Sequence, residues 1–170
     1  MYLLFEHKSY NEKWIALQLL EYILQIWKLK KSQGQKLPVV VPLVLYHGTS
    51  QWKIGLKLSD ILEYHDTRLR EYIPDFRYLL YDLTTRSDAE IYGSAQLKAM
   101  LFLLKYRDSE LLAQLGKILS LMKNLPDSEL GYLQSITIYV LSTTNIEVNQ
   151  FAQIARSEER RVGKECRSRW

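Results

Sequence analysis

The segment that most restricts the fold is the apolar run Val39–Tyr46, Val-Val-Val-Pro-Leu-Val-Leu-Tyr, in a chain of 170 residues. An uninterrupted aliphatic and β-branched run is typical of a strand that is buried on both faces, within a sheet that helices cover. Pro42 cannot donate a hydrogen bond to a neighbouring strand, so it indicates a bulge or an edge position. The run therefore predicts an α/β fold.

A second predicted strand, residues 2–9, carries two charges near its end. Glu6 and Lys8 are two positions apart, and in a strand this spacing places both side chains on one face. Strands often carry charges on an exposed or edge face, so a solvated ion pair is one interpretation. The other is a metal-dependent nuclease site, in which a carboxylate binds a divalent ion beside an activated water.

A helix is predicted directly after this strand, because Ser9–Glu12 has the Ser-x-x-Glu form of a capping box. Apolar residues then follow at helical spacing: Trp14, Leu17, Leu20, Ile23, Leu24 and Trp27. The polar stretch 28–36 around Gly34 ends the pattern. Gln18 and Tyr22 lie four residues apart and share a helix face, so both can point toward the charged pair. Residues of these types are also common at the boundary of a buried helix face.

The rest of the chain predicts a third strand followed by helices. The strand is expected at Phe76–Leu83. Helices are expected at Leu56–Tyr64, Asp88–Tyr106, Ser109–Lys123 and Glu129–Ser142, with a second capping box at Ser87–Glu90. The C-terminal half is therefore expected to be mostly helical.

Two further polar residues lie at the ends of predicted strands, and each has two interpretations. His47 precedes Gly48 in a predicted turn, where it is either a general base or DNA contact facing the site, or a histidine hydrogen-bonded within the turn. Asp82 is either a substitute acidic ligand or a residue that serves a turn with Thr84 and Thr85. We favour the turn for Asp82.

Together these segments resemble the Rpn family of recombination-promoting nucleases, also labelled transposases, in the RecB-type branch of the PD-(D/E)XK nuclease superfamily. The resemblance rests on Phe5–Ser9, Gln18–Tyr22, Leu37–Gly48 and Asp82–Thr84, in that order. It implies a restriction-endonuclease-like mixed sheet with a helical C-terminal half. It also implies Mg²⁺-dependent cleavage of DNA phosphodiester bonds, with DNA as the partner and a homo-oligomer left open.

The resemblance also assigns roles to individual residues. Glu6 and the backbone carbonyl of His7 are expected to bind the metal. Lys8 is expected to orient the attacking water and to stabilise its hydroxide form, and Gln18 with Tyr22 to position Lys8 or a phosphate. Glu6, Lys8, Gln18 and Tyr22 are thus the predicted catalytic residues.

The sequence departs from the family pattern at its start. Members carry an acidic residue on a strand upstream of the Glu-x-Lys strand, whereas this sequence begins at Met1 directly before that strand. The expectation is therefore a truncated, weakly active or inactive nuclease fragment whose sheet lacks its first strands. The alternative is a non-catalytic remnant that acts at most as a protein-binding helical module. A transposase with three catalytic carboxylates is a weaker alternative, because no such set is evident on strand ends.

The expected organisation is a partial nuclease core at 1–86, a helical region at 87–155, and a disordered tail of foreign appearance at 156–170. The tail has six Lys or Arg and three Glu without an apolar period, and supplies +3 of the net charge of +4. A basic arm for nucleic acid is the alternative interpretation of this tail. The remaining residues carry only +1, so the basic pI says little about DNA binding by the folded part.

Composition narrows the class of protein further. With 47% hydrophobic residues the chain can form a sizeable core. It has no apolar run of membrane-spanning length and no secretion signal at its start, so a cytoplasmic location is expected. Its single cysteine, Cys166, excludes an internal disulfide and a cysteine metal cluster.

Overall fold

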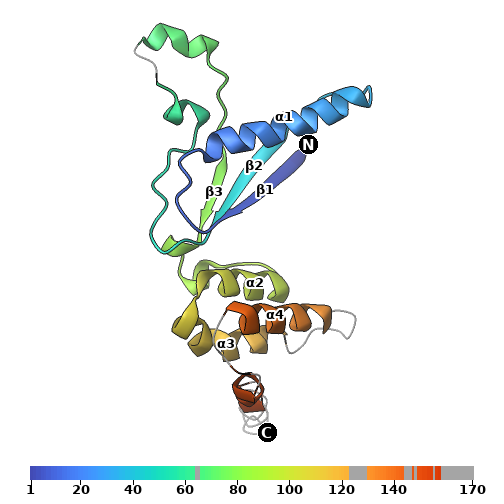
Figure 1. Ribbon diagram of the computed structural model, residues 1–170, viewed down its shortest axis with the longest axis vertical. Helices are drawn as coiled ribbons and strands as arrows, with labels where there is room; N and C mark the ends of the chain where they lie inside the picture. Colours follow the sequence, from blue (N-terminus) through green and yellow to red (C-terminus); the bar gives the residue numbers. More distant parts are fainter. Residues whose placement is uncertain (64–65, 123–129, 144–146, 148, 155, 158–170) are drawn as a thin grey trace. The chain divides into compact units, whose positions relative to one another are not determined.

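The computed structural model describes residues 1–63, 66–122, 130–143, 147, 149–154 and 156–157 (Figure 1). The chain divides into two compact units, Met1–Arg86 and Ser87–Trp170, which are described separately below. The first unit contains a small sheet and a long helix, and the second contains helices.

The sheet of the first unit has three strands in the order β1-β2-β3: β1 Tyr2–Lys8, β2 Val40–Tyr46 and β3 Leu79–Asp82. All three are parallel, so the expected mixed sheet is wrong for the described part of the chain, where only an isolated bridge between Lys57 and Arg77 is antiparallel. Each strand reaches the next through a long crossover, and this connection joins parallel neighbours. The C-terminal ends of the three strands therefore lie at one edge of the sheet.

The central strand tolerates its proline because of where the missing N–H would point. His47 N–H donates to the carbonyl of Lys8 on β1, and backbone groups alternate in direction along a strand. The nitrogen of Pro42 therefore faces the side of β3, where pairing starts only at Leu43. The predicted edge position is wrong among the described strands, because β2 lies between β1 and β3. The register of β2 with β1 is continuous, so the alternative, a bulge, is not found in that pairing either.

Helix α1, Ile15–Ser32, joins β1 to β2. The expected capping box is wrong: the helix begins at Ile15 after the N-cap residue Trp14, which makes no side-chain cap, and the Glu12 carboxylate accepts from the Trp14 N–H. The helix ends where Gly34 takes a φ of 66°, with Gly34 N–H and Gln35 N–H bonded to carbonyls of the last turn. This arrangement is a Schellman motif, which favours glycine because other residues are strained at positive φ.

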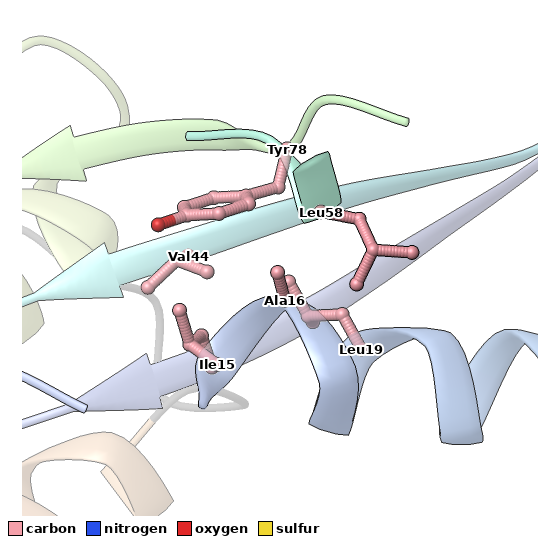
Figure 2. Close-up of a cluster of buried hydrophobic side chains, with 6 residues drawn as sticks. All are labelled: Ile15, Ala16, Leu19, Val44, Leu58 and Tyr78. Carbon is pink, nitrogen blue, oxygen red and sulfur yellow. The ribbon is translucent and has the colours of Figure 1, made fainter. Parts of the chain in front are cut away.

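Helix α1 covers one face of the sheet, and the core of the first unit lies between them (Figure 2). Six buried side chains form its centre: Ile15, Ala16, Leu19, Val44, Leu58 and Tyr78. Leu58 comes from the short helix η1, Leu58–Ile61, and Tyr78 directly precedes β3. The helix predicted at Leu56–Tyr64 is thus present in shorter form as η1, and η2, Thr67–Tyr72, follows it in the chain. The strand predicted at Phe76–Leu83 is present in shorter form as β3, and η3, Leu83–Thr85, follows it.

The second unit contains η4, Asp88–Glu90, and the helices α2 Ala95–Lys105, α3 Asp108–Met122 and α4 Leu130–Thr143, and residues 149–154 are helical as well. The capping box at Ser87–Glu90 is confirmed, but the continuous helix expected over 88–106 is wrong. Gly93 interrupts it with a φ of 135°, and the Ser94 hydroxyl then caps α2. The carboxylate of Asp88 accepts from Lys105 at 2.6 Å, and from Tyr106 and Lys117 each at 2.5 Å, which ties η4 to α2 and α3.

Two expectations concern regions that the structure describes only in part. Of the predicted tail, Arg156 and Ser157 are helical, and 158–170 lie outside the described residues. None of the helices in the described part of the chain has the length and apolar character needed to cross a membrane.

Candidate functional site

Glu6 and Lys8 lie on the same side of β1, as their spacing predicts. The Lys8 ammonium is 3.5 Å from the Glu6 carboxylate, and the side chains are only 11% and 20% exposed, respectively. A largely buried charge needs compensating partners, because water no longer solvates it. The pair is therefore a partly desolvated site and not a solvated pair on an exposed face.

A second partner of Lys8 comes from helix α1. Lys8 Nζ donates to Gln18 Oε1 at 2.8 Å, and Gln18 Nε2 donates to the Tyr22 hydroxyl at 2.7 Å. The predicted juxtaposition of these four residues is thus confirmed as a continuous chain of contacts from Glu6 to Tyr22. Because both ends of the Gln18 amide are engaged, the side chain holds the ammonium in one position.

The loop after β1 adds two residues that the sequence pattern did not single out for the site. The Tyr10 ring centroid lies 5.8 Å from Lys8 Nζ. A hydrogen bond to Glu12 raises the pKa of the Tyr10 hydroxyl, whereas a backbone bond from Trp14 and the bond from Tyr10 lower the pKa of Glu12. Lys8 lowers the pKa of Glu12 as well, so a second carboxylate lies within its electrostatic reach. The capping-box interpretation had assigned Glu12 to a helix end.

The oxygen donors that the resemblance assigns to a metal are the Glu6 carboxylate and the His7 carbonyl. Lys8 O points to β2, where it accepts from His47, so the alternation of the strand directs His7 O to the opposite side of β1. The described residues contain no group of three or more His, Cys, Asp or Glu side chains that could hold a metal. The Glu6 carboxylate and the His7 carbonyl are too few to enclose Ca²⁺ or Zn²⁺ with protein ligands. Two such oxygens are compatible with Mg²⁺, which keeps several waters and often binds only one or two carboxylates together with substrate phosphates.

His47 lies with His7 rather than beside Lys8. The two imidazole rings stack with centroids 6.0 Å apart and an interplanar angle of 21°. Side chains alternate along β1, so His7 and its stacking partner are on the face opposite Lys8. This position does not suit a general base acting at Lys8.

Asp82 serves the turn, as we favoured from the sequence. One carboxylate oxygen accepts from Thr84 N–H at 2.9 Å and Thr84 hydroxyl at 2.7 Å, and the other accepts from Trp52 N–H at 3.0 Å. In the strand register Asp82 is opposite Tyr46, which in turn is opposite Lys8. A strand therefore separates Asp82 from the lysine.

Asn11 is a further residue that sequence reasoning missed. Its amide nitrogen donates to the Tyr46 hydroxyl at 3.0 Å and to the Gln51 carbonyl at 3.3 Å, and its oxygen accepts from Lys53 N–H at 2.7 Å. These bonds join the loop after β1 to the loop after β2. A single asparagine with partners more than thirty residues away leaves no local signal, and only its position directly after the Lys8 strand could have suggested a role.

Comparison with known proteins identifies relatives of this chain. A family model described as "Putative transposase, YhgA-like" matches residues 1–131. The inactive recombination-promoting nuclease-like protein RpnE of Escherichia coli (strain K12) is 30% identical over 125 residues, which are 72% of this chain and 41% of that protein. The recombination-promoting nuclease RpnA of the same strain is 33% identical over 93 residues, or 54% of this chain and 31% of that protein.

The chain thus spans less than half the length of these two curated relatives. No solved structure matches it at a significant level. The family match covers more than half of the chain, including the Lys8 strand, helix α1 and all three strands of the sheet. The chain therefore belongs to the YhgA-like family that includes the Rpn proteins.

Proposed function

We propose that this chain carries the catalytic site of a Mg²⁺-dependent DNA endonuclease and cleaves phosphodiester bonds by hydrolysis. The observation that carries the proposal is the Lys8 ammonium, 11% exposed and held between Glu6 at 3.5 Å and Gln18 at 2.8 Å. An ion pair that only makes the surface polar does not require a buried lysine whose position is fixed by an amide, or an amide that is itself fixed by Tyr22. Such a lysine is suited to bind a water or a phosphate oxygen at a defined point.

In this proposal each residue has a distinct role. Lys8 donates to the attacking water and favours its hydroxide form, while Gln18 and Tyr22 keep the ammonium in position. A compact ammonium with three donors can contact Glu6, Gln18 and the water together. Mg²⁺, bound by the Glu6 carboxylate and the His7 carbonyl, would neutralise charge that develops on the phosphate.

The proposal extends to the fold and to the rate. The parallel β1-α1-β2 unit is compatible with a restriction-endonuclease-like core, which we propose for the whole protein. Two oxygen donors leave most of the Mg²⁺ coordination to water and DNA, so we expect weak metal binding and slow cleavage by this chain. DNA as the substrate is consistent with the name of the relative RpnA, a recombination-promoting nuclease.

A non-catalytic role is the second candidate, and two observations favour it. The name of the relative RpnE describes that protein as inactive. The second unit also contains a cavity of about 580 Å³ lined mainly by apolar side chains of α2 and α4, among them Leu97, Met100 and Ile136. In this alternative the chain would act through its helical unit, and the Glu6–Lys8 pair would only stabilise the first unit.

Nicking of supercoiled plasmid in the presence of Mg²⁺ separates the two candidates. We expect slow nicking by the unaltered chain and by the control Glu21→Gln, whose exposed side chain lies on α1. Glu6→Gln should be slower by about a hundredfold or more, because it removes the charged oxygen donor for the ion. No nicking by the unaltered chain would favour the non-catalytic role, and equal nicking by Glu6→Gln would exclude Glu6 from catalysis.

A further inference from the structure

The loop that leads from β1 to α1 exposes two aromatic rings, the first of which lies beside Lys8. Tyr10 is 58% exposed and Trp14 is 51% exposed, although they are only four residues apart. Each ring has a lysine over it: Lys8 Nζ is 5.8 Å from the Tyr10 centroid, and Lys13 Nζ is 5.0 Å from the Trp14 centroid. The loop thus combines π faces and ammonium groups within residues 8–14.

Exposure of a single aromatic residue is ordinary on a protein surface. The arrangement here differs because one of the rings, Tyr10, adjoins the lysine of the candidate site, the other follows four residues later in the same loop, and each is paired with a cation. Asn11 also anchors the loop between them through its bonds to Tyr46 and Lys53, so the rings project from a fixed backbone. An anchored loop loses less conformational entropy than a mobile one when a flat ligand stacks on its rings.

Nucleobases of single-stranded DNA are the ligands that fit this chemistry. Base faces stack on exposed aromatic rings, and lysines beside them bind the phosphates that link successive bases. In a duplex the same faces are covered by neighbouring base pairs. We propose that Tyr10 and Trp14 form a stacking platform for unpaired bases, which directs single-stranded or frayed DNA to Lys8. This inference rests on the proposed function, since it names the substrate class of the same site.

The charges around the platform indicate how the binding should depend on salt. Lys8 and Lys13 are balanced by Glu6 and Glu12, and both carboxylates are engaged, Glu6 with Lys8 and Glu12 with Tyr10 and Trp14 N–H. Few phosphates can therefore be neutralised here. Stacking, rather than charge, should contribute most of the affinity, so the affinity should fall only shallowly with salt.

Fluorescence anisotropy of a short labelled single strand, with the full chain and without Mg²⁺, tests the platform apart from cleavage. Tyr10→Ala and Trp14→Ala should each weaken binding roughly five- to hundredfold, the usual effect of losing one base stack. Tyr10→Phe keeps the ring without the bond to Glu12 and should bind as the unaltered chain does. Tyr72→Ala, which removes a 77% exposed ring from η2, is the matched control and should change nothing.

The outcomes distinguish the platform from the proposed nuclease. Equal affinity of the Tyr10→Ala chain and the unaltered chain, weak binding by Tyr10→Phe, or tighter binding of blunt duplex than of single strand would each overturn the platform. Loss of binding on removal of either ring, in a chain that cuts no DNA, would support the platform and contradict the nuclease. Nicking that needs Glu6 but is indifferent to both rings would do the reverse.

Discussion

Gln18 is the residue on which the position of the Lys8 ammonium depends most. Its oxygen accepts from the ammonium and its nitrogen donates to the Tyr22 hydroxyl, so the amide cannot rotate without breaking both bonds. The Glu6 carboxylate lies 3.5 Å from Lys8 Nζ, which is farther than the 2.8 Å between Lys8 Nζ and Gln18 Oε1. Without Gln18 the ammonium would keep its charge and lose its shorter contact.

Gln18→Ala should therefore affect both stability and chemistry. A largely buried ammonium that loses a hydrogen-bond acceptor costs about 1–3 kcal/mol, which urea unfolding would measure. Displacement of Lys8 by about 1 Å should slow nicking by roughly a hundredfold. Gln25→Ala, at an exposed position of the same helix, is the control. A Gln18→Ala chain that nicks plasmid at the original rate would show that Lys8 needs no such support.

Tyr78 predicts how the first unit responds to alkaline pH. Burial raises the pKa of its hydroxyl to about 12, and the hydroxyl donates to the Gly55 carbonyl at 2.7 Å. The fold favours the neutral form, so this contribution to stability is complete below about pH 10, the unfolded pKa, and is lost as the pH rises toward 12.

The check is urea unfolding of the unaltered chain and of Tyr78→Phe on both sides of the tyrosine pKa. Tyr78→Phe should cost about 1 kcal/mol near neutral pH, because the bond to Gly55 is lost. It should also remove part of the alkaline loss of stability. Parallel stability curves for the two chains above pH 10 would contradict the assignment to Tyr78.

At the scale of elements, the packing of α1 on the sheet positions Gln18 over Lys8. Leu19 is fully buried beside Val44, whereas Leu29 of the same helix is 56% exposed. Leu19→Ala should lower the free energy of unfolding by about 2–5 kcal/mol, and Leu29→Ala should stay within about 0.5 kcal/mol. Thermal or urea unfolding would measure both, and equal effects would mean that α1 does not pack on the sheet by this face.

The Asp88 carboxyl group of η4, in the second unit, should make the stability of the chain depend on pH in the acid range. Burial opposes ionisation of Asp88, but hydrogen bonds from Lys105, Lys117 and Tyr106 outweigh it and hold the pKa of the carboxyl well below its ordinary value of 3.8. A lowered folded pKa contributes stability that is present above the unfolded value and is lost as the pH falls below it.

Asp88→Asn should therefore destabilise the chain by about 2 kcal/mol near neutral pH, since charged hydrogen bonds to two lysines are weakened. The difference from the unaltered chain should shrink as the pH falls below about 3.8, because the Asp88 carboxyl is then protonated in the unfolded chain while the folded chain still holds it ionised. Urea unfolding at several pH values would measure it, and a difference that is constant down to pH 3 would refute this account of the cluster.

Across the whole molecule, the sequence correctly predicts which side chains share a face of one strand or helix, because the short-range periodicity of that element determines it. The period of two in β1 placed Glu6 with Lys8, and the four-residue spacing in α1 placed Gln18 with Tyr22, because the geometry of a single element decides each. The ends of elements depend on competing local bonds, so the start of α1 and the interruption at Gly93 were missed. Strand direction and the bonds of Asn11 depend on partners far along the chain, which no local pattern encodes.

Lys8 is the proposed catalytic cation of a nuclease site. The most direct measurement is the rate of Mg²⁺-dependent plasmid nicking by the unaltered chain, by Lys8→Ala and by the control Lys28→Ala, which removes an exposed lysine from α1. We expect slow nicking that Lys28→Ala preserves and Lys8→Ala reduces by about a hundredfold or more, with circular dichroism showing both variants folded. Nicking at the same rate by folded Lys8→Ala, or none by the unaltered chain at any Mg²⁺ concentration, would exclude Lys8 from this role.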